Sequence, residues 1–95
     1  MTIYVDIDNT ICVTINNDYA NAKPIAHNIE KINRLYEEHF IVYYTARGSL
    51  SNTNYKELTE RQLKDWHVKY DKLRTDKPFY DIMIDDKAYK IENLK

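Results

Sequence analysis

The chain has 95 residues, of which 43% are hydrophobic, and 14 Lys and Arg stand against 15 Asp and Glu for a formal net charge of −1. This length predicts a single domain, residues 1–95, and the balanced charge argues against a nucleic-acid binder, which usually carries a basic excess. The single Cys12 excludes an internal disulfide, and we find no signal-like start and no apolar run of membrane-spanning length, so we expect a cytoplasmic protein with no membrane partner.

Strand and helix patterns alternate from the first residues. The β-branched and aromatic run 2–6 predicts a buried strand that ends in an acidic turn, and the polar, turn-rich stretch 9–23 predicts a loop. A helix should begin with Pro24 in its first turn and reach about residue 38, followed by a second strand at 40–44. The apolar residues of this helix share one face: Ile25, Ile29, Ile32 and Tyr36.

A loop around Gly48 then leads to a second helix, which begins between residues 53 and 59 and ends at Trp66. Thr59 and Gln62 have the spacing of a capping box, which favours the later start.

The last third of the chain predicts two more strands and a helix. A short strand is expected at 68–73, another at 80–84, and a final helix at 87–94. The alternation indicates an α/β fold, a single three-layer Rossmann-like domain with a mostly parallel sheet of about four strands.

Residues that carry chemistry follow the apolar runs in a fixed order. Asp6 and Asp8 follow the first run, Thr45 the second, and Asp85-Asp86 the run at 80–84, with Lys77 just before that run. Because the carboxyl ends of parallel strands share one edge of a sheet, we expect these side chains to meet there. Carboxylates, a hydroxyl and a lysine in one crevice suit Mg²⁺ and a phosphoryl group.

The two acids of this pair can take two different catalytic roles. In an extended segment Asp6 and Asp8 point to the same side while Ile7 points toward the core. One carboxylate can bind metal and attack phosphorus, and the other can donate a proton to the leaving oxygen and later activate water.

Each of these pieces also has an ordinary structural interpretation when it is taken alone. Acidic pairs at strand ends are often turns or helix caps, a lone lysine is usually on the surface, and the hydroxyl of Thr45 is commonly satisfied by backbone. Arg47 has two interpretations of equal weight: its guanidinium contacts a second anionic group of the substrate, or it is a structural residue, either a surface arginine or the partner of a neighbouring carboxylate in a salt bridge. The order of the four pieces favours a functional site.

The series Asp6-x-Asp8-x-Thr10, Thr45, Lys77 and Asp85-Asp86 resembles the four motifs of the haloacid dehalogenase superfamily, mostly Mg²⁺-dependent phosphatases. The resemblance implies that Asp6 is the nucleophile, Asp8 the general acid and base, and Thr45 and Lys77 the phosphoryl-binding residues. It implies a metal held by Asp6, the backbone carbonyl of Asp8, Asp85 and, through water, Asp86. Asn9 stands where that family most often has Gly, and Asn tolerates the backbone angles that Gly adopts.

The chain also resembles, more loosely, small members of that superfamily encoded near capsule and surface-polysaccharide genes. The segments that carry this likeness are Tyr44-Thr45-Ala46-Arg47-Gly48, Leu58-Thr59-Glu60, Lys77-Pro78 and Ile84-Asp85-Asp86-Lys87-Ala88. It implies a cap-less phosphomonoesterase that acts on a small phosphorylated metabolite such as a sugar phosphate.

Three further hypotheses stay open. An uncovered site would also admit a phosphoprotein or a nucleic-acid end, and a receiver-like phosphoacceptor module uses similar residues, although its acceptor Asp would follow a middle strand. A homo-oligomer is expected if Tyr19, Leu50 and Tyr55 form an exposed rim that a neighbouring subunit covers, whereas these side chains could instead fold back onto their own loops.

Overall fold

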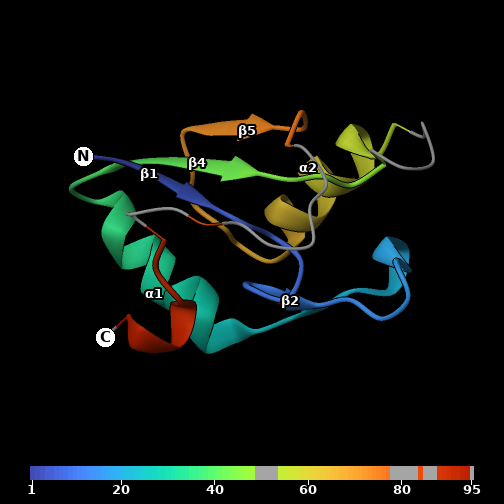
Figure 1. Cartoon of the computed structure of the whole chain (residues 1–95), viewed down its shortest axis with the longest axis horizontal. Coiled ribbons are helices and arrows are strands. Elements are labelled where there is room, and N and C mark those ends of the chain that lie inside the picture. Colours follow the sequence, from blue (N-terminus) through green and yellow to red (C-terminus); the bar gives the residue numbers. More distant parts are fainter. Residues whose placement is uncertain (49–53, 78–83, 85–87, 95) are drawn as a thin grey trace.

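A three-stranded parallel sheet lies at the centre of the molecule (Figure 1). The computed structural model describes residues 1–48, 54–77, 84 and 88–94. Strands β1 (Thr2–Val5), β4 (Phe40–Tyr44) and β5 (Lys72–Arg74) are arranged in the order β1-β4-β5. The α/β character and the parallel pairing predicted from the sequence are confirmed, and the third strand begins later than expected.

The sheet buries one face and leaves much of the other exposed. Ile41 and Tyr43 of β4 are fully buried, and they belong to the same core cluster as residues of both helices, α1 (Ala26–Tyr36) and α2 (Lys56–Asp65). On the opposite face Tyr4 is 54% exposed. Both helices lie on one side of the sheet in Figure 1, so the described residues form two layers and not the three that we expected.

The described residues of the C-terminal segment do not form the helix that was expected there. Where the sequence predicted a helix over 87–94, the described residues form irregular backbone followed by the single 3-10 turn η2 (Ile91–Asn93). An isolated eight-residue helix is marginal because its nucleation cost is recovered over too few hydrogen bonds. Ile91 and Leu94 pack against the core, and the Nζ of Lys31 in α1 donates to the Ile91 carbonyl at 3.5 Å, which keeps this segment on the helical side. The expected strand at 80–84 lies outside the described residues except for Ile84, which is exposed.

The segment predicted to be a loop at 9–23 has structure of its own. Strands β2 (Cys12–Val13) and β3 (Lys23–Pro24) pair antiparallel, and the 3-10 turn η1 (Tyr19–Asn21) lies between them. Because Pro24 belongs to β3, α1 begins two residues later than predicted. Asn9, Asn16 and Asn17 adopt positive φ angles of 62°, 53° and 59°, which Asn tolerates better than most residues. Asparagine therefore supplies the tight turns in a chain with one glycine.

Helix α2 begins at Lys56, before the predicted capping box. The side-chain oxygen of Asn54 accepts the Lys56 N–H at 2.9 Å, so Asn54 satisfies a donor at this helix end. Thr59 and Gln62 instead lie within α2, about one turn apart on the same face, and both are buried. The capping-box prediction is wrong, and these two residues have another use, described below.

The Cα radius of gyration is 12.8 Å, close to the roughly 12 Å expected for a single compact unit of this length. Within the described part of the chain, neither helix has the length and apolar character needed to cross a bilayer.

Candidate functional site

The turn after β1 places two carboxylates at the carboxyl edge of the sheet. Ile7 is fully buried, and its carbonyl accepts the N–H groups of Thr10 and Ile11 at 3.1 and 3.0 Å, which closes the turn. Asp6 and Asp8 on either side of Ile7 are partly exposed. The alternation expected of this segment therefore holds, with the apolar residue inward and both acids outward.

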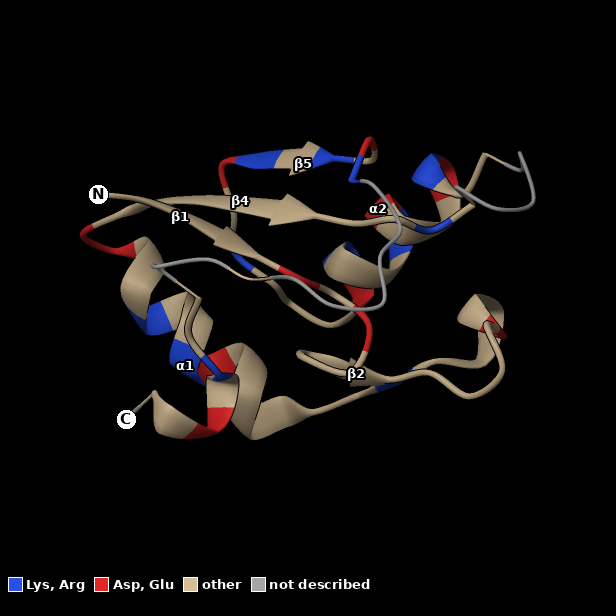
Figure 2. Ribbon diagram, in the orientation of Figure 1, with Lys and Arg blue, Asp and Glu red and all other residues tan. Residues whose placement is uncertain are grey.

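Lys77 reaches the same edge through backbone contacts with β4. The Thr45 N–H donates to the Arg74 carbonyl at 2.9 Å, and the Lys77 N–H donates to the Thr45 carbonyl at 3.2 Å. The Nζ of Lys77 then lies 3.3 Å from Oδ1 of Asp6, with side-chain exposures of 13% for the lysine and 43% for the aspartate. Asp6 and Lys77, from the first and third predicted motifs, are thus brought together. Figure 2 colours the acidic residues that follow β1 red and the basic residues that follow β4 and β5 blue.

The hydroxyl of Thr45 is turned into the protein. Thr45 is 1% exposed, and its Oγ1 accepts the backbone N–H of Arg47 at 3.1 Å. This is the ordinary role considered for a hydroxyl at a strand end. Binding of a phosphoryl group by Thr45 stays a prediction.

Arg47 forms a buried ion pair with Asp8. Its Nη2 lies 2.9 Å from Oδ1 of Asp8, and its Nε lies 3.0 Å from Oδ2 and 3.3 Å from Oδ1. The arginine side chain is 1% exposed and the aspartate side chain 22%. The structure shows a salt bridge between Arg47 and Asp8, one of the expected alternatives. Contact of Arg47 with an anionic group of the substrate stays a prediction.

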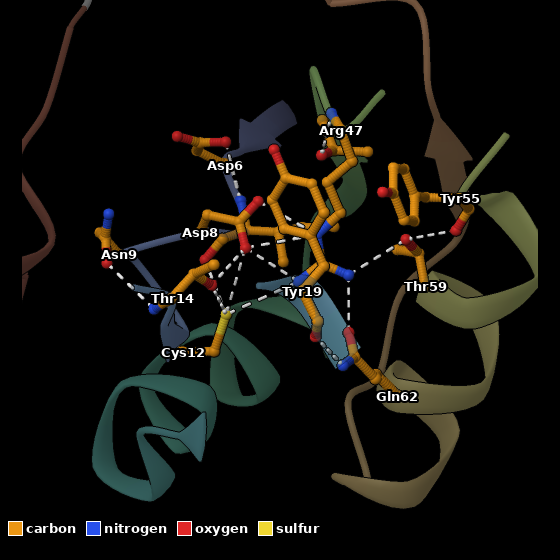
Figure 3. Close-up of polar contacts among 12 residues, drawn as sticks. Asp6, Asp8, Asn9, Cys12, Thr14, Tyr19, Arg47, Tyr55, Thr59 and Gln62 are labelled. Atoms are coloured by element: carbon orange, nitrogen blue, oxygen red, sulfur yellow. Dashed lines mark hydrogen bonds and ion pairs between the residues drawn. The ribbon is translucent and has the colours of Figure 1, made fainter. Parts of the chain in front are cut away.

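Helix α2 and the β2–β3 segment hold the rest of the guanidinium (Figure 3). The Nη1 of Arg47 donates to Oγ1 of Thr59 at 3.1 Å and to Oε1 of Gln62 at 2.6 Å. The ring of Tyr19 covers the guanidinium face, with its centroid 5.0 Å from Cζ. We call Tyr19, Thr59 and Gln62 the arginine cradle. Thr59 and Gln62 accept hydrogen bonds from Nη1, and Tyr19 covers one face of the guanidinium.

The two oxygens of Asp8 are not equivalent. Besides Nη2 of Arg47, Oδ1 accepts the Thr14 hydroxyl at 2.6 Å and has the Cys12 thiol 3.7 Å away. Oδ2 has Nε of Arg47 as its contact among the described residues. A carboxylate oxygen offers about two acceptor positions, so Oδ1 is filled and Oδ2 keeps one position open.

Burial controls the neighbouring titratable groups. Burial raises the pKa of the Cys12 thiol, and the negative charge of Asp8 acts in the same direction. The pKa of Tyr19 is raised by burial and, to a smaller extent, by Asp8. Cys12 is a small buried residue beside the acid rather than an exposed nucleophile.

The two aromatic residues of the predicted rim fold back onto the site. The rings of Tyr19 and Tyr55 contact each other edge to face, with centroids 5.0 Å apart, and the Gln62 side-chain N–H donates to the Tyr19 carbonyl at 2.6 Å. Both tyrosines are partly buried in the chain itself. Leu50, the third residue of that rim, lies outside the described residues.

Asp85 and Asp86, the expected metal ligands from the last strand, also lie outside the described residues. In the part of the chain that the structure does describe, no three His, Cys, Asp or Glu side chains gather closely enough to hold a metal ion. Of the two acids after β1, Asp6 has the more exposed side chain, at 43% against 22% for Asp8.

Sequence reasoning missed the arginine cradle and Thr14. The i, i+3 spacing of Thr59 and Gln62 was the available signal, since it places two polar side chains on one face of any helix that begins before them. Their burial identifies that face as the one turned toward the protein.

No protein-family model matches the chain, and no curated protein matches it either. The chain is similar to the crystal structure of an MCSG target from Vibrio cholerae, with a TM-score of 0.85 and 27% sequence identity. The likeness covers 98% of this chain and 85% of that one. The similarity supports a small α/β domain with a parallel sheet and two helices.

Proposed function

We propose that this protein is a Mg²⁺-dependent phosphomonoesterase with the cap-less core of the haloacid dehalogenase superfamily, acting through an aspartyl-phosphate intermediate. The observation that carries the proposal is the pair of acids at one sheet edge in different surroundings. Asp6 is partly open and paired with Lys77, whereas Asp8 is held by a buried arginine. Two carboxylates with separate environments suit a nucleophile and a proton-transfer group.

Asp6 has the attributes of the nucleophile. Its Oδ1 is fixed by the Ile7 N–H at 2.9 Å and by Lys77 at 3.3 Å, and 43% of its side chain is exposed. A carboxylate held in this way faces solvent and approaching substrate without a rotamer change. Lys77 provides positive charge beside it and lowers the repulsion between a carboxylate and a phosphate dianion.

The donor chemistry fits a hard divalent cation. Asp6 offers a carboxylate oxygen, Asp8 a backbone carbonyl beside it, and Asp85 and Asp86 further carboxylates by resemblance. A Mg²⁺ ion bound there would neutralise phosphate charge and orient the ester.

Asp8 would move the proton in both halves of the reaction. When an Asp6 oxygen bonds to phosphorus and the P–O bond to the leaving group breaks, Asp8 gives its proton to the departing alkoxide. Asp8 then takes a proton from the water that attacks the aspartyl-phosphate, which releases inorganic phosphate and restores Asp6.

A small phosphorylated metabolite, such as a sugar phosphate used in surface-polysaccharide assembly in the cytoplasm, is the substrate we propose. This part rests on the resemblance of Tyr44-Thr45-Ala46-Arg47-Gly48 and the segments quoted with it.

The test is release of inorganic phosphate from a panel of phosphate monoesters, measured with Mg²⁺ and with excess chelator. We expect turnover with Mg²⁺ and loss with chelator. Asp6→Asn should abolish turnover, while Asp65→Asn, an exposed aspartate at the end of α2, should retain it. Mass spectrometry after trapping with beryllium fluoride or rapid acid quench should place the phosphoryl mark on Asp6, and a mark on another residue would overturn the assignment.

A further inference from the structure

We propose that Arg47 is a positioning residue for Asp8: its guanidinium fixes the plane of the carboxylate and, together with Thr14, fills Oδ1, so that Oδ2 keeps the open acceptor position. The inference rests on the proposed function, since it assigns a task to the acid of that reaction. It differs from the expectation that Arg47 contacts substrate.

The first argument is the geometry of the pair. Nε and Nη2 of Arg47 face the carboxylate as a fork, with contacts of 3.0 Å to Oδ2 and 2.9 Å to Oδ1. A planar guanidinium fixes the plane of its partner carboxylate as well as its position, which a lysine cannot do. Asp8 is therefore restrained in rotation about its side-chain bonds.

The second argument is the asymmetry of the two oxygens. Thr14 at 2.6 Å and Nη2 of Arg47 fill Oδ1, while Oδ2 keeps an open acceptor position. Among the residues that the structure describes, the titratable or charged groups that face Asp8 are Arg47 after β4, Cys12 in β2 and Tyr19 in η1.

The third argument is the construction around the arginine. A buried cation costs free energy unless it is paired, and the cradle supplies neutral acceptors and an aromatic face but no negative charge. Among the described residues, Asp8 is the anion in contact with Arg47. The cradle therefore holds the arginine in place, and the arginine in turn holds the acid.

Leaving-group dependence tests the proposal. An ester with a poor leaving group, such as an alkyl phosphate, needs the proton from Asp8, whereas p-nitrophenyl phosphate needs it much less. For Arg47→Gln we expect kcat/KM to fall about 100-fold with the alkyl ester and less than about 10-fold with the aryl ester. A purely structural role would lower both by the same factor.

A double-mutant cycle separates positioning from general damage. In an Asp8→Asn background, Arg47→Gln should add less than about a 3-fold further loss with the alkyl ester, because the group that it positions no longer carries a proton. Arg34→Gln is the matched control, since Arg34 pairs with Glu30 on the surface of α1 and should leave both esters unaffected.

Two more variants keep the test decisive if Arg47→Gln folds poorly. Arg47→Lys keeps the charge but loses the fork, and we expect it to recover stability without recovering the leaving-group ratio. Thr59→Val removes an acceptor of Nη1 with little change in shape, and should shift the ratio in the same direction by a few fold.

The outcomes also separate this proposal from the one on which it rests. If the wild-type protein hydrolyses neither ester, the proposed function fails. Two results would reject the positioning role while leaving the proposed phosphatase activity intact. In the first, the wild type is active and Arg47→Gln lowers kcat/KM by the same factor for both esters. In the second, Arg47→Gln causes as large a loss in the Asp8→Asn background as in the wild type.

Discussion

Two ion pairs lie at the same edge of the sheet and differ in almost every physical respect. Arg47 and Asp8 are joined through three contacts of 2.9 to 3.3 Å, and the arginine is enclosed by the cradle. Lys77 and Asp6 are joined by one contact of 3.3 Å, with the aspartate nearly half exposed. The first pair has fixed geometry, and the second can exchange its partner for an incoming anion or cation.

This difference predicts a division between stability and turnover. A partly exposed pair contributes little to folding because water competes with it, whereas a buried charge left without its partner is costly. Substitutions at Lys77 should therefore impair chemistry and spare the fold, and substitutions at Arg47 should affect both. The predictions below follow from that contrast.

The largest effect is expected for Lys77→Met. Losing the cation beside the proposed nucleophile should lower kcat by about 100-fold to 1,000-fold, the usual result of removing one electrostatic group from an active site. The free energy of unfolding should change by less than about 1 kcal/mol. Phosphate-release kinetics and urea denaturation of the same preparation check both numbers, and a large loss of stability would contradict the contrast.

Arg47→Met should destabilise the fold by about 3 kcal/mol, somewhat less than for a fully enclosed pair because Asp8 is 22% exposed. The loss leaves the Asp8 carboxylate without its cation and the cradle acceptors without a donor. Urea denaturation measures it, with Arg34→Met as the surface control, for which we expect a change near 0.3 kcal/mol. Equal changes in the free energy of unfolding of the two variants would mean that the buried pair stabilises the fold no more than a surface pair does.

The reactivity of the Cys12 thiol reports whether the Arg47–Asp8 pair beside it stays buried. Burial raises the pKa of its thiol, so little thiolate is present at pH 8, and alkylation by iodoacetamide should be at least about 10-fold slower than for a free thiol of pKa near 8.5. The rate should climb as pH rises past that value. Arg47→Met should speed the labelling because breaking the buried pair exposes the thiol, and this exposure must outweigh the loss of a cation that lowers the thiol pKa. Lys77→Met should leave the labelling rate unchanged; mass spectrometry of timed samples measures both rates.

The smallest effect concerns a buried polar group without a partner. The hydroxyl of Tyr43 has no hydrogen-bond partner among the described residues, and burial raises its pKa far above the usual tyrosine value. Tyr43→Phe should be neutral or stabilising by up to about 1 kcal/mol at pH 7.

The pH dependence of that effect has a definite sign. Because the folded pKa of Tyr43 is raised, the unfolded chain loses this proton first, and stability falls as pH rises past about 10. Tyr43→Phe should reduce that alkaline loss in thermal melts between pH 8 and 11. An unchanged alkaline slope would show that other tyrosines dominate it.

The sequence predicted the meeting of Asp6, Asp8 and Lys77 because the physical rule behind it is general. Residues that follow parallel strands share an edge, and the apolar Ile7 between two acids sets which way they point. The same rule placed Thr45 and Arg47 at the edge. It did not decide whether Arg47 contacts substrate or protein.

The partners of Arg47 depend on tertiary placement that local patterns do not encode. Thr59 and Gln62 match a capping box as well as they match a buried polar face, and the choice depends on where α2 begins. Asn54, five residues before Thr59, accepts a backbone N–H at that helix end. Thr59 and Gln62 are therefore available for contacts with Arg47. The predicted C-terminal helix was wrong for the described residues, because a segment this short gains too few hydrogen bonds to offset helix nucleation.

The paired strands are far apart in the sequence, and this distance affects the rate of folding. β1 pairs with β4 so that Thr2 lies beside Phe40, and Asp8 meets Arg47 across 39 positions. Contacts of this separation form only after a large loop has closed, which slows folding relative to a domain built from neighbouring hairpins. The arginine can be buried against its anion only when the sheet, α2 and the β2–β3 segment have all assembled. Recovery of activity after dilution from denaturant should therefore coincide with the last folding phase, and intermediates that already contain helix should be inactive.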